Sequence, residues 1–229
     1  MKKINQKYII IAIIILVVFL LALYFKTDKN LEKIDIKNIN KSYEYKIIAF
    51  GDSLTAGFGL PLNESYPFQL KIRLQEIGLD NVDVINSGIS GETSRGNLER
   101  AQFIRNQNPD IVILGIGGND ALRRLSIEEM ENNINQTISI LKSGSKPPRI
   151  ILLQMQAPIN YGLNYKKEFD AVYTNLAKKH NVKIVPFLVS EVFRDQNLLL
   201  ADGIHPNKSG YEKLVNDFLL KPVIEELNK

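Results

Sequence analysis

The chain has 229 residues, enough to bury a full hydrophobic core, and 45% hydrophobic and 24% charged residues are ordinary values for a globular protein. It has no cysteine, which excludes a disulfide framework, a zinc–thiolate site, a cysteine nucleophile and a lipidated N-terminal cysteine. The net charge of +4 is modest and the lysines are spread along the chain, so no nucleic-acid partner is expected.

An apolar segment near the N-terminus predicts a membrane anchor. The run from Tyr8 to Phe25 has no charged residue, and as a helix it would span about 27 Å, close to the thickness of the hydrocarbon core. Lys2, Lys3 and Lys7 precede the run, as in an export signal. Bulky residues end it where a cleavable signal peptide would have small ones, which favours an uncleaved signal anchor over a cleaved peptide.

This anchor sets the expected domain organisation. Residues 1–7 would form a short cytoplasmic N-terminus and residues 8–25 the transmembrane helix, because positive charges precede the apolar run. Residues 26–43 are polar, rich in Lys and Asn, and are expected to be a tether. Residues 44–229 would form one folded domain on the outer side of the membrane.

The remaining sequence alternates between strand-like and helix-like segments. The expected strands are 45–50, 82–86, 111–116, 149–155 and 182–187, and the expected helices are 66–77, 94–105, 126–141, 165–179 and 209–227. Ser126 and Glu129 have the spacing of a capping box, and Pro222 should kink or split the last helix. Continuous apolar strands alternating with helices predict an α/β fold, a three-layer α/β/α sandwich around a five-stranded parallel sheet.

Three glycine-rich segments follow the first three predicted strands, at the edge where parallel α/β sheets bind ligands. Ser53, in 51–57, could present its hydroxyl and backbone N–H at a strand-to-helix turn. Gly91, in 86–94, precedes a helix N-terminus, where free N–H groups favour anions. Asn119, in 115–120, could donate its amide to an oxyanion. Taken alone, the Ser53 and Gly91 segments fit an ordinary turn or loop better than a site, and the Asn119 segment is a moderate signal.

The two histidines have different surroundings. Asp202 lies three residues before His205 in a glycine turn, where a carboxylate can reach an imidazole and fix its tautomer. His180 ends a predicted helix, where a cation complements the helix dipole, and is therefore expected to be structural.

Taken together, these segments resemble the four conserved blocks of the SGNH (GDSL-type) hydrolases, and most closely those of the bacterial thioesterase I, lysophospholipase and arylesterase group. The resemblance implies that Ser53 is the nucleophile, His205 the general base and Asp202 the residue that orients the base. It also implies an oxyanion hole made by Ser53, Gly91 and Asn119.

The same resemblance extends to substrate and location. It implies a small-molecule acyl ester or lipid as substrate, no metal and no cofactor, and a monomer. Combined with the predicted anchor, it implies a single-pass protein of the bacterial inner membrane with its catalytic domain on the periplasmic or extracellular side. The candidate substrate-binding residues are Asp52, Leu54, Leu122, Ala157 and Pro158.

Three functions remain open at this point. The first is an esterase or thioesterase for lipid-type acyl esters, and the second is a carbohydrate O-acetyl esterase acting on envelope glycans. The third is a non-catalytic binding domain tethered to the membrane. The complete set of Ser53, Gly91, Asn119 and the Asp202–His205 pair argues against the third.

The anchor makes a direct prediction about the full-length protein. It should sediment with membranes and stay there through high-salt washing, because an apolar helix of this length is held by the hydrocarbon core rather than by charge. N-terminal sequencing of the mature protein tests the uncleaved form. A mature chain that begins downstream of Phe25 would rule it out.

Overall fold

The computed structural model describes residues 36–187 and 190–229, so the predicted transmembrane helix at 8–25 and most of the predicted tether lie outside the described residues. The chain divides into two units, Met1–Asn38 and Ile39–Lys229, and the fold below belongs to the second. Across these two described ranges, no helix is both long and apolar enough to cross a bilayer.

Five parallel strands form one sheet, as the sequence predicts. They are β1 (Tyr45–Gly51), β2 (Val82–Gly88), β3 (Ile111–Gly115), β4 (Arg149–Gln154) and β5 (Lys183–Pro186). The order across the sheet is β2-β1-β3-β4-β5, so the connections leave β1 and β3 in opposite directions. Such a switch point leaves a crevice at the carboxyl ends of the two strands.

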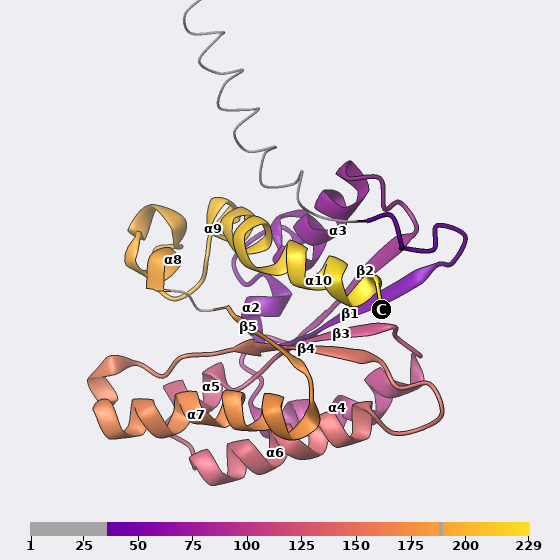
Figure 1. The fold of residues 1–229 in the computed structure, drawn as a ribbon. Coiled ribbons are helices and arrows are strands. Elements are labelled where there is room, and N and C mark those ends of the chain that lie inside the picture. Colours follow the sequence, from indigo (N-terminus) through magenta and orange to yellow (C-terminus); the bar gives the residue numbers. More distant parts are fainter. Residues whose placement is uncertain (1–35, 188–189) are drawn as a thin grey trace, which may run out of the picture. The chain divides into compact units, whose positions relative to one another are not determined.

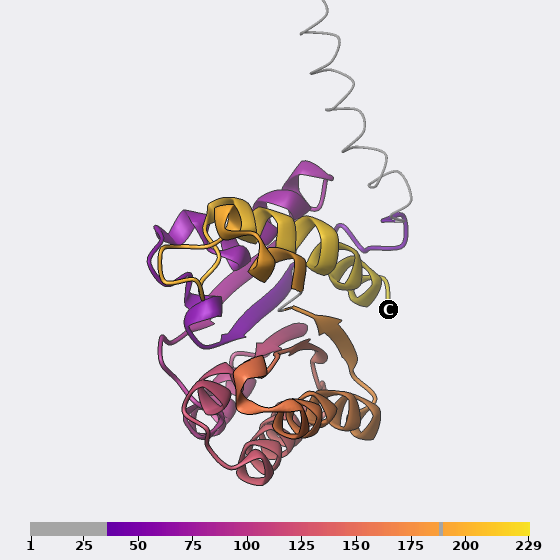
Figure 2. The same ribbon diagram turned by 90° about the vertical axis from the view of Figure 1, so that its left-hand side faces the viewer.

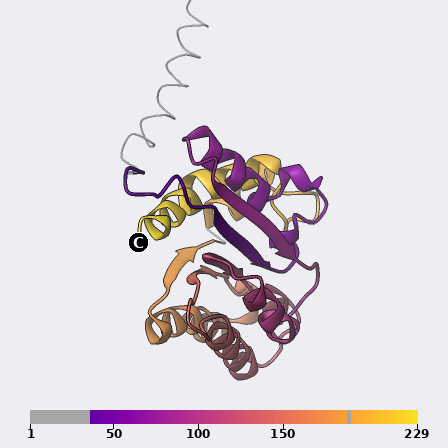
Figure 3. The ribbon, with the colours of Figure 1, turned by 90° about the vertical axis from the view of Figure 1, so that its right-hand side faces the viewer.

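Helices cover both faces of the sheet. One layer contains α3 (Tyr66–Glu76), α9 (Lys208–Leu214) and α10 (Leu220–Leu227), and the other contains α4 (Ser94–Asn106), α6 (Ile127–Leu141) and α7 (Leu163–His180) (Figure 1). Side views show the sheet between these two layers (Figures 2 and 3). The predicted three-layer α/β/α architecture of this unit is therefore confirmed.

Short helices that the sequence pattern does not predict lie in the connecting loops. They are α2 (Ser53–Ala56), η1 (Leu62–Glu64), α5 (Gly118–Leu122), η2 (Ile159–Tyr161), α8 (Ser190–Arg194) and η3 (Gln196–Leu198). None is longer than five residues, too short for an amphipathic repeat to appear in the sequence. In Figure 1, α2, α5 and α8 lie toward the same end of the sheet.

The helix predicted at 209–227 is split, as Pro222 suggested. A π-helical segment, Val215–Leu219, separates α9 from α10. Pro222 has no N–H, and its ring would clash with the carbonyl of Phe218 in a continuous α-helix. The wider turn lies directly before the proline and relieves that clash. The predicted cap of α6 is also present, because Ser126 accepts a hydrogen bond from the Glu129 N–H at 3.2 Å.

The last residues of the predicted tether pack onto the folded unit, which begins at Ile39 rather than at Glu44. The Ile39 side chain is only 4% exposed. The Tyr43 hydroxyl donates to Asp110 Oδ1 at 2.8 Å. Asn81 Nδ2 donates to the Tyr43 carbonyl at 2.6 Å. These contacts give residues 39–43 a part in the stability of the fold.

Trimming the chain tests this boundary. A protein that begins at Glu44 should have a free energy of unfolding about 2–4 kcal/mol lower than one that begins at Ile39, because it loses a buried isoleucine and a hydrogen bond to Asp110. Urea denaturation measures the difference. The variant Ile39→Ala in the longer chain should reproduce most of it, and equal midpoints for the two chains would contradict the boundary.

Candidate active site

The structure brings together the three residues predicted to form a catalytic triad. Ser53 Oγ lies 2.9 Å from His205 Nε2, and His205 Nδ1 lies 2.7 Å from Asp202 Oδ2. Ser53 opens α2 after β1, whereas Asp202 and His205 lie in the loop before α9. A hydroxyl, an imidazole and a carboxylate in this order can take a proton from the serine and stabilise the charged imidazole.

The Asp202 carboxylate is held by its own turn. Its Oδ1 accepts the backbone N–H groups of Ile204 at 2.9 Å and His205 at 3.0 Å, while its Oδ2 accepts from the imidazole. Burial raises the pKa of Asp202, but these hydrogen bonds outweigh it and lower the pKa to about 2. Asp202 is therefore ionised at neutral pH, which favours a proton on Nδ1 of His205 and leaves Nε2 to accept from Ser53.

A row of three glycines places Ser53. Gly51 at the end of β1 pairs with Gly88 of β2 on one side and with Gly115 of β3 on the other. A Cβ on Gly51 would lie 2.3 Å from the Gly115 carbonyl oxygen, and a Cβ on Gly88 would lie 2.2 Å from the Ala56 nitrogen. The helix α2 thus packs directly on the backbone of the sheet, with Ser53 in its first turn.

Two backbone N–H groups near the triad have no protein acceptor. They belong to Ser53 and Gly91, and this holds for acceptors among the residues that the structure describes. Gly91 has φ +80°, a conformation that L side chains rarely adopt. Its carbonyl accepts from Arg123 Nη2 at 2.8 Å. Free N–H groups beside a nucleophile are suited to bind a developing negative charge.

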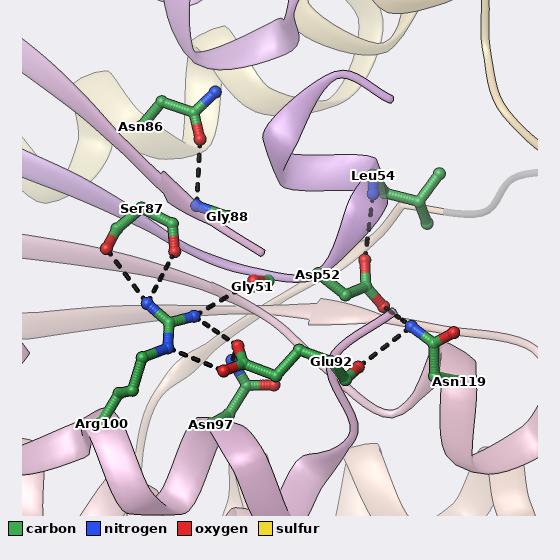
Figure 4. Close-up of polar contacts among 10 residues, drawn as sticks. All are labelled: Gly51, Asp52, Leu54, Asn86, Ser87, Gly88, Glu92, Asn97, Arg100 and Asn119. Carbon is green, nitrogen blue, oxygen red and sulfur yellow. Dashed lines mark hydrogen bonds and ion pairs between the residues drawn. The ribbon is translucent and has the colours of Figure 1, made fainter. Parts of the chain in front are cut away.

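Asn119 supplies a third donor, from α5 after β3. Its Nδ2 donates to the Glu92 carbonyl at 3.0 Å and to Asp52 Oδ2 at 3.3 Å (Figure 4). The amide therefore joins the loop after β2 to the loop after β1. The carboxyl ends of β1, β2 and β3 thus each carry one of the three predicted oxyanion donors.

Asp52 is a buried carboxyl group beside the nucleophile. It is 1% exposed, and its Oδ1 caps α2 by accepting the Leu54 N–H at 3.0 Å. Burial raises the pKa of Asp52 to about 7, against the lowering effect of its hydrogen bonds from Leu54 and Asn119. The sequence marks Asp52 as a substrate-binding candidate, but in the structure it contacts the site through Asn119.

The other substrate-binding candidates differ in exposure. Leu54 is 6% exposed and Ala157 is 5% exposed, so both offer little surface to a substrate. Pro158 is half-buried, and Leu122 is 45% exposed. The Tyr161 hydroxyl donates to the Leu122 carbonyl at 3.0 Å and so joins the 157–161 segment to the end of α5.

His180 has no part in this site. It is the last residue of α7, and its Nε2 lies 2.9 Å from Asn135 Oδ1 of α6. Burial, together with Lys179 and Lys142, lowers the pKa of His180. The structural role expected for it is consistent with these contacts, but the neighbouring lysines oppose the cationic form that the helix-dipole argument assumed.

Sequence reasoning missed several residues that support the site. The Phe58 ring lies 4.7 Å from the His205 ring, between centroids. The buried Tyr211 of α9 donates its hydroxyl to the Leu54 carbonyl at 2.8 Å and ties α9 to α2. Glu92 and Arg100 form a largely buried ion pair. None of these residues belongs to a motif with recognisable spacing. The one available signal was that Glu92, a charged residue, directly follows Gly91.

Comparisons with known proteins bear on the fold and on the class of reaction. The sequence model of the GDSL-like Lipase/Acylhydrolase family matches residues 49–213, most of the chain. An arylesterase of Vibrio mimicus is 32% identical over 80% of this chain and 90% of its own length. Thioesterase 1/protease 1/lysophospholipase L1 of Escherichia coli K12 is 32% identical over 76% of this chain and 81% of its own length.

A solved structure also matches. The psychrotrophic esterase EstA from Pseudoalteromonas sp., in a structure inhibited by monoethylphosphonate, superposes with a TM-score of 0.68 at 30% sequence identity. The match covers 75% of this chain and 92% of that one. The fold is therefore the SGNH hydrolase fold that the sequence resemblance implies.

The buried Asp52 predicts a pH dependence of stability. Between pH 4 and pH 7 the folded protein keeps a proton that the unfolded chain releases, because the pKa of Asp52 is about 7 in the fold and the ordinary pKa of an aspartate is 3.8. The free energy of unfolding should therefore fall as the pH rises through this window. The amide side chain of the variant Asp52→Asn cannot titrate. Between pH 4 and pH 7 the free energy of unfolding of this variant should therefore fall by up to about 4 kcal/mol less than that of the wild type.

Urea denaturation at each pH measures the slope, which separates titration from any constant cost of placing an amide next to Asn119. Asp83→Asn is the control, because Asp83 is an exposed residue of β2 paired with Lys71. Its slope should match that of the wild type. Identical slopes for Asp52→Asn and wild type would contradict a raised pKa at Asp52.

Proposed function

Because the chain belongs to the GDSL-like lipase/acylhydrolase family and is a carboxylic ester hydrolase, we propose that it hydrolyses lipid-type acyl esters and thioesters with Ser53 as nucleophile. The observation that carries this proposal is the continuous line of hydrogen bonds from Ser53 through His205 to Asp202, at 2.9 and 2.7 Å. A serine hydroxyl is a weak nucleophile until a neighbouring base takes its proton.

Acylation begins with that proton transfer. His205 Nε2 takes the proton of Ser53 as the oxygen attacks the substrate carbonyl carbon, and the carbonyl π pair moves to oxygen. Asp202 stabilises the imidazolium that forms. When the tetrahedral intermediate collapses, the C–O or C–S bond to the leaving group breaks, and His205 returns the proton to the departing alcohol or thiol.

The negative oxygen of the intermediate lies among three donors. The Ser53 and Gly91 N–H groups have no protein acceptor among the described residues, so they can bind it without first breaking a hydrogen bond. Asn119 keeps one amide hydrogen on the Glu92 carbonyl at 3.0 Å. Its other hydrogen makes the longer contact to Asp52, 3.3 Å, and is the one that would be shared with the oxyanion.

Deacylation repeats the same steps with water. His205 takes a proton from a water molecule, which attacks the acyl-enzyme carbonyl, and the acid is released as Ser53 regains its proton. Every proton in this sequence moves between Ser53, His205 and the reactants. The proposed mechanism uses no metal and no cofactor.

The preference for lipid-type acyl chains rests on two supports. Two relatives are named arylesterase and thioesterase 1/protease 1/lysophospholipase L1, and the last of these names includes a phospholipid-type ester. In this chain, Leu122 lies three residues after Asn119 with an exposed apolar side chain, and Pro158 is half-buried in the segment that Tyr161 joins to it. We propose that these two residues contact the acyl chain.

We also propose that residues 8–25 anchor the protein in the bacterial inner membrane, with the hydrolase unit on the periplasmic or extracellular side. The charge-free run and the preceding lysines support this placement. Acyl esters of the cell envelope would then be within reach.

The base assignment makes the sharpest prediction for this mechanism. His205→Ala should lower kcat on p-nitrophenyl butyrate by at least about 10³-fold, because no other side chain among the described residues bonds to the Ser53 hydroxyl. His180→Ala is the matched control and should stay within about twofold of the wild type. Steady-state kinetics on variants with unchanged far-UV circular dichroism provide the measurement. Equal losses for the two variants would mean that the base is misassigned.

A panel of p-nitrophenyl esters from acetate to palmitate tests the substrate class with the same proteins. Lipid-type activity should give higher kcat/KM on medium or long chains than on acetate, and Leu122→Ser should reduce that preference while leaving acetate turnover within about twofold. A wild-type preference for acetate alone would favour the carbohydrate O-acetyl esterase. No turnover on any ester would leave only the binding domain.

A further inference from the structure

Arg100, which lies outside the triad, contacts two of the three strand ends whose loops carry the oxyanion donors. Arg100 lies on α4, and Figure 4 shows its guanidinium pointing toward Gly51, Ser87 and Glu92. Its Nη1 donates to the Ser87 carbonyl at 3.1 Å and to Ser87 Oγ at 3.4 Å. Its Nη2 donates to the Gly51 carbonyl at 3.5 Å. The group thus joins the ends of β1 and β2.

The main partner of Arg100 is the carboxylate of Glu92. Arg100 Nε donates to Oε1 at 2.7 Å and Nη2 donates to Oε2, so the pair is bidentate. Asn97 Nδ2 also donates to Glu92 Oε2, at 2.7 Å. The Arg100 guanidinium stacks on the Phe50 ring at 4.7 Å from its centroid. Both charges therefore sit in a fixed geometry rather than in a flexible surface pair.

Burial makes this pair costly to disrupt. The Arg100 and Glu92 side chains are 22% and 10% exposed, so water does little to solvate either charge. A buried charge that loses its partner is strongly destabilised, whereas the intact pair roughly balances its own desolvation cost. The pair is therefore poor evidence of added stability, and its position beside the nucleophile loop needs another reason.

That reason is the route from Glu92 to the oxyanion donors. Glu92 directly follows Gly91, so fixing its side chain restrains the peptide that carries the free N–H. The Glu92 carbonyl accepts from Asn119 at 3.0 Å, so the same residue sets the direction of the Asn119 amide. The Gly51 carbonyl lies two residues before Ser53. The guanidinium is therefore linked to the Ser53 donor through Gly51, and to the Gly91 and Asn119 donors through Glu92.

We propose that the Arg100–Glu92 pair is a positioning device that sets the geometry of the oxyanion hole, and this inference rests on the proposed function of Ser53, Gly91 and Asn119. Neither side chain touches the substrate. Only arginine meets the requirement, because its planar fork donates to a carboxylate and to two carbonyl groups at once. A lysine would keep the charge but has one nitrogen in place of three.

The test uses two variants: one replaces the arginine fork but keeps its positive charge, and the other removes the negative charge of its partner. Arg100→Lys and, separately, Glu92→Gln should lower kcat on p-nitrophenyl butyrate by about 10- to 100-fold, because donors displaced by a fraction of an ångström bind the transition state less well. KM should change by less than about threefold. Arg95→Lys is the matched control on the same helix, since Arg95 forms an exposed ion pair with Glu99, and it should match the wild type.

Two inhibitors separate positioning from a general loss of structure. A p-nitrophenyl alkylphosphonate should phosphonylate Ser53 more slowly in both variants, in proportion to the loss of kcat, because its phosphoryl oxygen would occupy the oxyanion hole. A phenyl alkyl ether of the same chain length has no carbonyl, so its inhibition constant should not change. A merely structural pair would move both inhibitors together or neither.

The outcomes distinguish this inference from the function beneath it. If Ser53→Ala is inactive and both pair variants, folded by circular dichroism, keep kcat within twofold of the wild type, the positioning role is wrong and the esterase mechanism stands. If Ser53→Ala keeps wild-type turnover, the proposed function itself fails. If Arg100→Lys does not fold, Glu92→Gln carries the test, since it keeps the size and shape of the side chain and one accepting oxygen.

Discussion

The close packing of α2 on the row of glycines is the constraint on which this site depends. Gly88, Gly51 and Gly115 lie side by side across three strands, and side chains on the first two would collide with backbone atoms at 2.2 and 2.3 Å. Because α2 sits directly on this row, Ser53 emerges at the junction of β1 and β3, where the loops of neighbouring strands must pass within hydrogen-bonding distance. The donors, the Arg100–Glu92 pair and the docking of the last helix all follow from that proximity.

Much of this arrangement could be predicted from the sequence, because its signals lie within a few residues of one another in the chain. β1 and β3 were predictable because their apolar runs end at glycines. Asp202 and His205 were recognisable because a three-residue turn alone can hold their contact. The positions of Arg100 and Tyr211 could not be predicted, since each acts on a backbone carbonyl, Gly51 or Leu54, that no side-chain pattern reveals. The start of the folded unit at Ile39 was missed for a similar reason: a single apolar residue in a polar segment shows no periodicity.

The fold shifts the pKa values of two carboxyl groups near Ser53 in opposite directions. Asp202 accepts two backbone N–H groups and an imidazole, and its pKa falls to about 2. Asp52 is more deeply buried, and its pKa rises to about 7 despite contacts with Leu54 and Asn119. The fold thus keeps a full negative charge where it orients the proposed base, and limits negative charge near the donors that would bind an oxyanion. A second permanent anion there would repel the intermediate that those donors stabilise.

The hydrogen bond between Ser53 and His205 joins residues 152 positions apart in the chain. The proposed base belongs to a turn whose position depends on the docking of α9, through the contact between Tyr211 and the Leu54 carbonyl. A ribosome makes the serine early and the histidine late, so a growing chain carries the proposed nucleophile without its proposed base. The proposed triad would be complete only after the final segment has been made and α9 has docked. A copy of the chain that stops before His205 would therefore have the serine and its glycine row but no group to take the serine proton from this turn.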